Sequence, residues 1–443
     1  KSTLGINTEA GDVVDENLHI TLQPQTSVVV MDQYTGQVKA IVGGRGTKTT
    51  SRSLNRATDS PRQPGSCFKI VSTYAPALNE CGMTLASTIT DEPYYYANGK
   101  EVRNWDRKYI GNTTMRYAIL HSMNVCAVRT LTEVVTPEKG YQYLQKFGFT
   151  TLVNNDPDYP GMTDIAQATA LGGITRGVYN LEMTAAYASI ANGGVYTEPV
   201  LYTEILDHDG NVLIDNSAPE THEVIKESTA YLLTSAMQDV INDPNGTGGA
   251  ARMSNMPVSG KTGTTNDSTD LWLSAYTPYY TASIWVGYDE NKSMEHMNQS
   301  WHMRIWKQIM EQIHSGLAYK DFSVPSSIVQ KTICSETGKL AVSSCPAVTE
   351  YFDGDTLTSE VCEGHYVEEE VIEEESSTEE VPEGEATPPE EQQPVEPGQP
   401  VEPGQPVEPE QPDNPEQPVE PEQPDNPEQP VEPGQPVEPL PSG

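Results

Sequence analysis

Residues 64–69 read PGSCFK, and they open an apolar run with helical periodicity that extends to Leu78. Pro-Gly is a helix-start signal, so Ser66 is predicted to lie in the first helical turn. At a spacing of three residues, the Ser66 hydroxyl and the Lys69 ammonium group lie on one helix face and can share a hydrogen bond. A serine becomes a strong nucleophile when a neighbouring base takes its proton, and a neutral lysine is such a base. This segment therefore predicts a serine acyl-transfer site at the start of a helix.

The charge of Lys69 decides whether such a site can work. A lysine that is neutral near pH 7 needs a pKa lowered from about 10.4 to about 7, which corresponds to about 4 to 5 kcal/mol. Burial or a neighbouring cation lowers a lysine pKa, and Lys261 is the predicted cation. At the helix start, free backbone N–H groups and the positive end of the dipole favour the negative charge that develops next to Ser66.

A second motif, Ser122-Met123-Asn124, follows a helical stretch over residues 114–121. It is typical of a turn between two helices, with Ser122 and Asn124 on one side and Met123 pointing away. The Ser122 hydroxyl can relay a proton, and the Asn124 carboxamide can hydrogen bond to a peptide-like substrate. Because Ser and Asn are also common in ordinary turns, a purely structural role for this motif stays open.

The third motif is KTGTT at residues 261–265, and it precedes two strand-like runs at residues 270–273 and 282–288. We expect this motif on an edge strand, where Lys261 lines a cleft. Gly263 has no side chain, so it would not obstruct a close approach of substrate.

The threonines of the third motif are predicted to contact substrate. The hydroxyl groups of Thr262 and Thr264 suit a carboxylate, and the Thr264 N–H is predicted to form an oxyanion hole with the N–H of Ser66. The predicted substrate-binding residues are Thr262, Gly263, Thr264 and Thr265. The predicted catalytic residues are Ser66, Lys69, Ser122, Asn124 and Lys261.

Together the three motifs resemble those of the penicillin-binding proteins and serine beta-lactamases. Their flanks narrow the resemblance to the class A, high-molecular-mass penicillin-binding proteins. The flanks are NRAT at 55–58, RQPGS at 62–66, the stretch 170–194 that begins ALGGITRGV, and GTGGAA at 246–251. The resemblance covers about residues 20–318. It departs from the family pattern at Cys67, where small or hydroxyl residues are more usual.

The resemblance implies a transpeptidase fold of the penicillin-binding type and a D,D-transpeptidase that cross-links peptidoglycan stem peptides. Ser66 would attack the carbonyl of a terminal D-Ala-D-Ala bond, release D-alanine and pass the acyl group to an amine on a neighbouring stem. Beta-lactams would acylate the same serine. The implied partners are therefore stem peptides and beta-lactams, at the extracytoplasmic face of the bacterial membrane or in the cell wall.

Two other functions stay open at this stage. A D,D-carboxypeptidase or beta-lactamase forms the same acyl-enzyme and passes the acyl group to water. A beta-lactamase needs a base for that step, and residues 122–261 contain no clear Glu-x-x-x-Asn segment to supply it. A non-catalytic sensor module that beta-lactams acylate permanently would carry the same three motifs.

Strand patterns lie at both ends of the main body and helical patterns lie between them. This order predicts an α+β fold, with an antiparallel sheet completed by both ends of the domain and helices on both sides. Strands are expected at 27–32 and 38–43 and around Val258, Trp272 and Trp285, a hairpin at 202–215, and helices within 66–192 and at 226–241 and 300–315. The predicted divisions are an N-terminal connecting segment (1–20), a transpeptidase domain (21–323), a small Cys-containing β-rich appendage (324–366) and an acidic Pro-rich disordered tail (367–443).

The chain has six cysteines, three in the main body and three in the appendage. A disulfide between Cys334 and Cys345 and fully reduced thiols both stay open. No CxxC pair or histidine cluster indicates a metal, so neither a metal nor a cofactor is expected.

Acidic residues dominate the end of the chain. Of the 64 Asp and Glu residues, 25 fall between Glu363 and Glu438, where no Lys or Arg occurs. This charge argues against nucleic acid and anionic membrane surfaces as partners. Hexapeptides of the type QPVEPG repeat from Gln393 to Leu440 with proline at every third position, which is typical of polyproline II. The tail is interpreted as a solvated disordered segment, with a wall-threading spacer or an SH3-like ligand as alternatives.

The start of the chain lacks an initiator Met, and no run of 18 or more apolar residues occurs. We therefore expect a fragment or processed chain. In the full-length protein, the family resemblance implies a preceding glycosyltransferase domain and an N-terminal membrane anchor.

Overall fold

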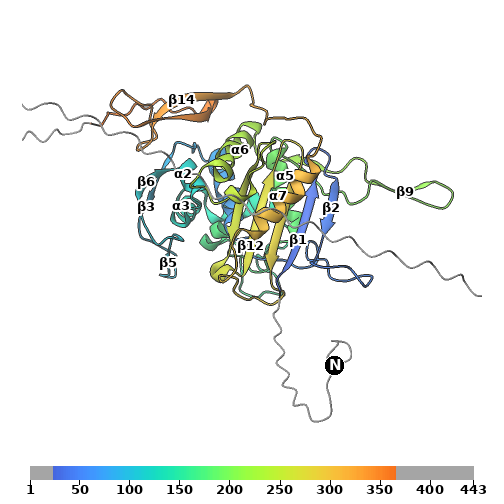
Figure 1. The fold of residues 1–443 in the computed structure, drawn as a ribbon. Helices are drawn as coiled ribbons and strands as arrows, with labels where there is room; N and C mark the ends of the chain where they lie inside the picture. Colours follow the sequence, from blue (N-terminus) through green and yellow to red (C-terminus); the bar gives the residue numbers. More distant parts are fainter. Residues whose placement is uncertain (1–22, 366–443) are drawn as a thin grey trace, which may run out of the picture. The chain divides into compact units, whose positions relative to one another are not determined.

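The computed structural model describes residues 23–365, and its centre is a five-stranded antiparallel sheet of order β11-β12-β13-β1-β2 (Figure 1). Residues 1–20 and 367–443, the predicted connecting segment and tail, lie outside the described residues. The strands of the sheet are β1 (Gln25–Met31), β2 (Val38–Val42), β11 (Ser259–Thr264), β12 (Asp270–Tyr276) and β13 (Thr281–Gly287).

Strands from both ends of the main body meet in this sheet. β1 pairs with β13, so that Val28 lies opposite Ile284, and β2 forms a hairpin with β1. The structure therefore confirms the predicted hairpin and the sheet completed by both ends. β11, which carries residues 261–264 of the third motif, is an edge strand of this sheet, as predicted.

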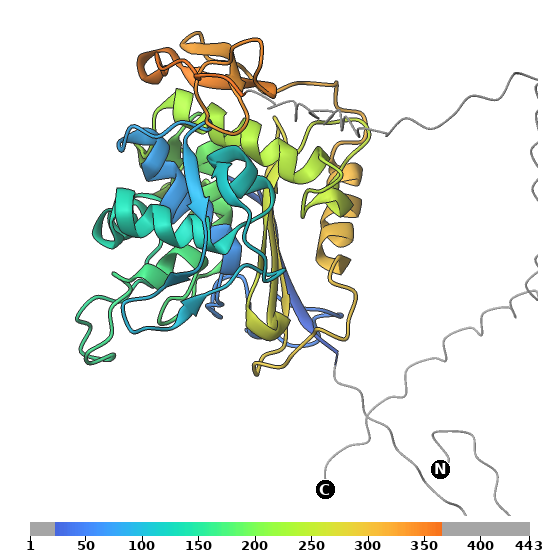
Figure 2. The same cartoon turned by 90° about the vertical axis from the view of Figure 1, so that its left-hand side faces the viewer.

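The two faces of the sheet pack against different helices. Because side chains alternate along a strand, Trp272 and Trp285 pack with the large helical region, whereas Leu273 and Ile284 pack with α7 (Trp301–Ile313). Figure 2 shows α7 on one side of the sheet and the larger helical region on the other. This arrangement confirms the predicted α+β fold with helices on both sides.

A continuous helical segment over residues 65–79 carries the first motif. It changes type along its length, and its middle part, η3, is π-helical. Pro76 lies two residues after the end of η3. It has no N–H to donate to the Ser72 carbonyl, and in a regular α-helix its ring would clash with that carbonyl. The wider π turn avoids that clash. The helical elements are η2 (Gly65–Cys67), η3 (Lys69–Tyr74), α1 (Ala75–Asn79), α2 (Met115–Leu120), α3 (Asn124–Thr130), η4 (Leu131–Val135), α4 (Pro137–Lys146), η5 (Gln167–Leu171), α5 (Asn180–Ala191), α6 (Glu227–Asn242), η6 (Gly249–Ala251), η7 (Asn266–Ser268) and η8 (Gly354–Thr356).

Short strands that the sequence did not predict occur within residues 88–114, where mainly helix was expected, and on either side of the predicted hairpin at 202–215. Their two to four residues are too few to give a clear alternation of polar and apolar side chains, which is why the pattern missed them. They pair as β3 (Thr88–Asp91) with β6 (Gly111–Thr114), β4 (Tyr94–Tyr95) with β5 (Glu101–Val102), and β7 (Val195–Thr197) with β10 (Thr221–Glu223).

The predicted hairpin at 202–215 is confirmed as β8 (Glu204–Leu206) paired with β9 (Val212–Asp215). Its apolar side chains, including Leu206 and Leu213, are exposed.

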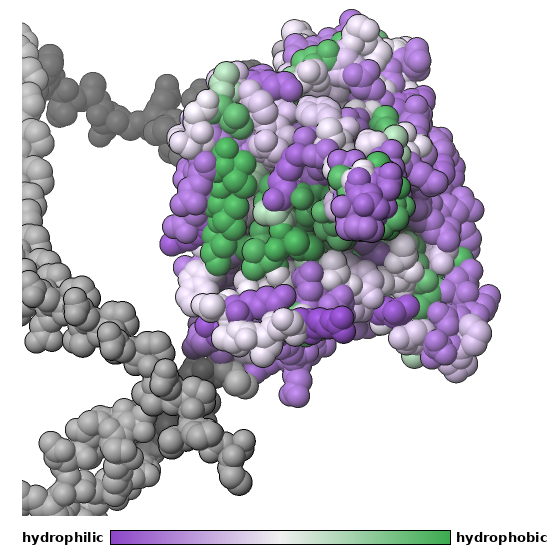
Figure 3. All heavy atoms as spheres, turned by 90° about the vertical axis from the view of Figure 1, so that its right-hand side faces the viewer, coloured by the Kyte–Doolittle hydropathy of each residue, from purple (hydrophilic) through white to green (hydrophobic). Residues whose placement is uncertain are grey.

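Apolar side chains gather on the face of the molecule that is seen in Figure 3. Among the described residues, no helix combines the length and apolar character needed to cross a membrane.

The appendage forms an antiparallel hairpin that contacts the main body. Ile333 and Phe352 are buried together with Ala86 of the body. Arg116, also from the body, donates a hydrogen bond from Nη2 to Oε1 of the buried Glu350 at 2.7 Å. The hairpin strands are β14 (Ile328–Cys334) and β15 (Ala347–Asp353).

Replacing Trp306 with Ala tests the packing of α7 on the sheet. Trp306 is 1% exposed, and its Nε1 donates a hydrogen bond to the Ala282 carbonyl at 2.9 Å. We expect Trp306→Ala to lower the free energy of unfolding by about 3 to 5 kcal/mol in denaturant titrations. Trp301 lies on the same helix and is 44% exposed, so Trp301→Ala is the matched control and should cost much less. Equal losses for both variants would contradict this packing.

Candidate active site

Ser66 lies in η2, which packs closely against the edge strand β11. Gly65 has a φ of +54°, and a Cβ at this position would lie 2.8 Å from the carbonyl oxygen of Thr264. Only glycine therefore allows the backbone before Ser66 to approach the third motif this closely. The first and third motifs, which are almost 200 residues apart in the sequence, meet at this contact.

Lys69 is fully buried and points toward the second motif. Its Nζ lies 2.5 Å from the Ser122 carbonyl oxygen, 2.6 Å from Asn124 Oδ1 and 3.2 Å from Ser122 Oγ. The first two partners can only accept, so a neutral amine would use its two N–H bonds on them and turn its lone pair toward the Ser122 hydroxyl. In the described part of the chain, no hydrogen bond joins Lys69 to the half-buried Ser66, although their spacing had suggested one.

Ser122 lies between two buried lysines. Lys261 Nζ donates to Ser122 Oγ at 2.8 Å and to the Thr262 carbonyl at 3.1 Å. Ser122 has a φ of +52°, a left-handed conformation that costs a non-glycine residue about 1 to 3 kcal/mol. It occupies the predicted turn between α2 and α3, and the strained turn aims both its hydroxyl and its carbonyl oxygen at Lys69.

Burial controls the charges of the two lysines. It lowers the pKa of Lys69 well below the ordinary lysine value, and the nearby charge of Lys261 lowers that pKa further. Burial also lowers the pKa of Lys261 to about 8. Two ammonium groups around one hydroxyl repel each other, so the site favours neutral Lys69 beside protonated Lys261. The structure therefore places Lys261 where a second cation beside Lys69 was predicted.

Asn124 is held by residues outside the three motifs. Its Nδ2 donates to the Arg103 carbonyl at 2.8 Å, so both ends of its carboxamide already have protein partners. Its backbone N–H and that of Val125 donate to Asn104 Oδ1, which caps the start of α3. Asn104 in turn donates to Asp91 Oδ1 at 2.8 Å. Asn104 was not predicted from the sequence, because a cap supplied from 20 residues upstream leaves no local pattern.

The hydrogen-bond alternation along β11 decides where its backbone groups point. Thr265 N–H bonds to Asp270 O across the pair with β12. By alternation, Thr264 is in a non-hydrogen-bonded pair with Leu271, so its N–H points toward the free edge of the sheet. The N–H of Thr264 therefore lies on the side where η2 and Ser66 approach.

Gly263 serves packing rather than an open approach for substrate. A Cβ here would lie 2.4 Å from the Pro64 carbonyl oxygen and 2.9 Å from Cys67 Sγ. The missing side chain lets the segment that carries Ser66 rest on β11. The thiol of Cys67 also donates to the Lys261 carbonyl oxygen at 3.3 Å, which ties the same two segments together.

The three threonines of the third motif have different surroundings. Thr262 Oγ1 lies 2.7 Å from Thr247 Oγ1, and Thr264 is exposed. Thr265 Oγ1 accepts the Asp270 N–H at 2.9 Å, so it helps to close the turn after β11. Thr247 was missed as a candidate, although it belongs to the GTGGAA flank.

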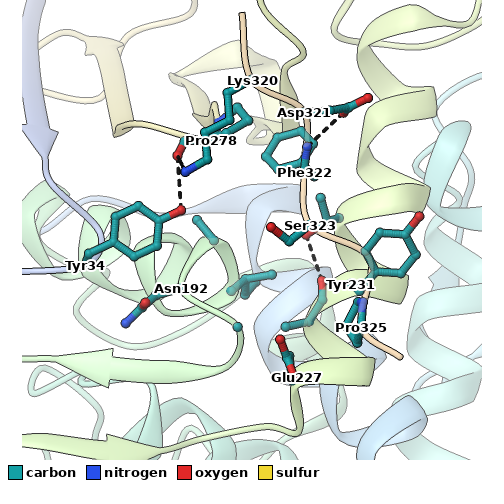
Figure 4. A pocket seen from close by; sticks show the side chains of 15 residues that line it. Tyr34, Asn192, Glu227, Tyr231, Pro278, Lys320, Asp321, Phe322, Ser323 and Pro325 are labelled. Carbon is teal, nitrogen blue, oxygen red and sulfur yellow. Dashed lines mark hydrogen bonds between the residues drawn. The ribbon is translucent and has the colours of Figure 1, made fainter. Parts of the chain in front are cut away.

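A separate pocket of about 240 Å³ is lined by residues of the main body and by Pro325 (Figure 4). Its lining includes Tyr34, Asn192, Glu227, Tyr231 and Lys320, and it contains none of the predicted site residues. The Tyr34 hydroxyl donates to the Pro278 carbonyl at 3.1 Å at its rim. The predicted site residues meet instead at the junction of η2, the Ser122 turn and β11, and we place the candidate active site there.

Comparison with known families identifies the main body. Residues 26–311 match the family model described as the penicillin binding protein transpeptidase domain. The chain belongs to the penicillin-binding protein transpeptidase family. Residues 324–366 match a second model, the C-terminal domain of penicillin-binding protein 1A. These matches confirm the resemblance to class A penicillin-binding proteins.

Relatives of this penicillin-binding protein are similar over most of the chain. Penicillin-binding protein 1A of Clostridium tetani is 35% identical over 360 residues, which are 78% of this chain and 45% of that protein. Penicillin-binding protein 1A/1B of Bacillus subtilis is 31% identical, over 82% of this chain and 41% of that protein. This chain thus spans less than half the length of these two relatives.

A solved structure confirms the fold of this penicillin-binding protein. The crystal structure of penicillin-binding protein 1A from Haemophilus influenzae matches with a TM-score of 0.65 and 26% identity. The match covers 76% of this chain and 54% of that one.

Cys67 lies next to Ser66, and its thiol should not compete as a nucleophile. Burial raises its pKa to about 11, so about one thiol in a thousand is a thiolate at pH 8. We expect native chain treated with iodoacetamide at pH 8 to be alkylated at the partly exposed Cys81 and not at Cys67, as measured by peptide mass spectrometry. Denatured chain is the control, in which both residues should react. Alkylation of native Cys67 as fast as Cys81 would contradict its burial.

Proposed function

We propose that this transpeptidase joins peptidoglycan stem peptides through an acyl-enzyme on Ser66, with a terminal D-Ala-D-Ala unit as donor. The observation that carries the proposal is the buried series of contacts from Lys69 through Ser122 to Lys261, next to the helical segment of Ser66. Such a series of hydrogen bonds can carry a proton from the attacking hydroxyl to the leaving nitrogen. Family membership supports a transpeptidase, and the serine mechanism and the donor are our inference.

The first step is acylation. Neutral Lys69 takes the proton of the Ser66 hydroxyl, and Oγ attacks the carbonyl carbon of the donor peptide bond. The oxygen that becomes negative is stabilised by the N–H groups of Ser66 and Thr264. As the C–N bond breaks, the proton passes from Lys69 through the Ser122 hydroxyl to the leaving nitrogen, and D-alanine departs.

The second step transfers the acyl group. An amine of a neighbouring stem attacks the ester carbon, and the Ser66 oxygen leaves with the proton that the amine gives up. The same Lys69 and Ser122 groups move this proton in the reverse direction. The product is a new amide bond between two stems, and Ser66 is regenerated.

The carboxylate of the terminal D-alanine needs positive charge and hydroxyl donors. Lys261 is the predicted cation, and Thr262 and Thr264 lie on the same strand. The Thr247 hydroxyl, which contacts Thr262, orients that threonine. In this proposal Gly263 acts indirectly by letting Ser66 approach β11, and Thr265 shapes the turn beside the substrate site.

We further infer the setting of the whole protein. The matches over 26–311 and 324–366 support a transpeptidase domain at 21–323 followed by the appendage at 324–366. The class A resemblance supports a glycosyltransferase domain and a membrane anchor in the full-length chain, with the site on the outer side of the cytoplasmic membrane.

Fluorescent penicillin labelling with peptide mapping tests the nucleophile. We expect one label, on Ser66, and a loss of labelling rate of about 1,000-fold or more in Ser66→Ala, because the attacking oxygen is gone. Ser53 is exposed, so Ser53→Ala is the matched control and should label normally. A label that maps to another serine would overturn the site.

A donor peptide that ends in D-Ala-D-Ala, incubated with an amine acceptor peptide, tests the reaction. Cross-linked product together with D-alanine supports the transpeptidase. D-Alanine without cross-linked product would indicate a carboxypeptidase, and penicillin labelling with neither product would indicate a sensor.

The pH dependence of acylation tests the role of Lys69. The neutral form is the base, so acylation should slow as pH falls through the lowered pKa of Lys69. Lys261→Ala removes the charge that helps to lower this pKa, so the acid limb of the pH–rate profile should move to higher pH. Lys320→Ala, at the separate pocket, should leave the limb in place. If the acid limb of the pH–rate profile stays at the same pH in Lys261→Ala, the charge of Lys261 does not lower the pKa of Lys69.

A further inference from the structure

Four potential metal ligands converge in the appendage. The sulfur atoms of Cys334, Cys345 and Cys362 and a ring nitrogen of His365 all lie within 4.8 Å of one another. His365 Nε2 lies 3.0 Å from Cys334 Sγ and 3.6 Å from Cys362 Sγ. In the structure the three cysteines are free thiols, so the disulfide that the sequence left open between Cys334 and Cys345 is absent.

The orientation of His365 suits metal binding. Its Nδ1 lies 3.1 Å from Glu336 Oε2, while Nε2 faces the sulfur atoms. The carboxylate therefore selects the tautomer with hydrogen on Nδ1 and the lone pair on Nε2. A carboxylate in this position is the usual outer partner of a zinc-bound histidine. The Val342 N–H also donates to Cys345 Sγ at 3.4 Å, which holds this sulfur in position beside the others.

We propose that Cys334, Cys345, Cys362 and His365 bind one zinc ion in a closed, tetrahedral structural site. Three thiolates and one imidazole are a common donor set of structural zinc sites. At Zn–S and Zn–N distances of about 2.3 and 2.0 Å, tetrahedral ligand atoms are about 3.5 to 4 Å apart, which the cluster can adopt with small shifts. Thiolate-rich sets exclude magnesium and calcium, which prefer oxygen ligands.

The ligands come from three separate turns, and this explains what the ion would do. Cys334 ends β14, Cys345 precedes β15, and Cys362 and His365 lie in the last described segment. The apolar core of the appendage is small, with Ile333 and Phe352 as its buried members. A zinc ion would join the three turns and stabilise a unit that has little core of its own.

The sequence contains no CxxC pair and no histidine cluster, and for this reason it did not predict a metal. The informative pair was Cys362-Glu363-Gly364-His365, in which a cysteine and a histidine have a ligand-type spacing. Gly364 has a φ of +93°, and this left-handed turn brings the two side chains to the same point.

Zinc content of the full chain tests the proposal. We expect chain loaded with zinc sulfate and freed of excess ion to hold one zinc per molecule by mass spectrometry of the metal. Cys362→Ser and His365→Ala should each lower zinc affinity at least about tenfold in competition with a chelating dye, whereas His365→Cys should keep the ion as a four-cysteine site. Cys81→Ser, a cysteine outside the cluster, is the matched control and should keep one zinc.

Spectra and thiol counts distinguish zinc binding from oxidation. Cobalt-loaded chain should show thiolate-to-cobalt charge-transfer absorption that Cys362→Ser lacks. Glu336→Gln, which alters only the outer partner, should weaken zinc binding about 10- to 100-fold while the stoichiometry at saturation stays at one. No bound zinc in the wild type, zinc retained unchanged in both ligand variants, or a disulfide among these cysteines in zinc-loaded chain would overturn the proposal. Ser66→Ala should keep its zinc, so this test is independent of the proposed reaction.

Discussion

The candidate active site depends on the hydroxyl of Ser122, which two buried lysines share. Neither Lys69 nor Lys261 reaches water, so each must find its partners inside the protein. Two full charges at this spacing would be unfavourable, and the site relieves the repulsion by keeping Lys69 neutral. The same constraint leaves Lys69 in the neutral form, which is the form that can accept a proton. Burial therefore favours a neutral amine here, whereas a lysine on the surface would stay charged.

Three chain segments must meet for this contact to form. The π-helical η3 carries Lys69, a strained turn carries Ser122, and the edge strand β11 carries Lys261. Two glycines, Gly65 and Gly263, let the segment of Ser66 lie directly on β11, because any side chain there would strike a carbonyl oxygen. The large buried side chains of the sheet pack against the helical region and so hold this junction in place.

Much of this arrangement was predictable from the sequence. Strands at both ends of the body gave the correct sheet, and the three motifs gave the groups that the structure brings together around Ser122. What remained hidden depends on contacts between distant segments. Asn104 caps α3 from another loop, Thr247 contacts Thr262 across a turn, and the ligands of the appendage converge from three turns. Local periodicity carries no record of such contacts. The short strands between α1 and α2 were missed for a different reason, because they contain too few residues to show alternation.

The pairing of β1 with β13 bears on how the chain folds. Val28 and Ile284 are neighbours in the sheet although most of the body separates them along the chain. Closing so large a loop is entropically costly, and folds with many such contacts form slowly. Along the chain, β1 and β2 come before β13, so their hairpin gains its next neighbour in the sheet only when β13 is present. The strand with Lys261 joins the sheet through β12 and β13, so the candidate site is complete only when these strands have paired. A chain that ends before β11 would therefore hold Ser66 without Lys261 and without the edge strand on which η2 packs.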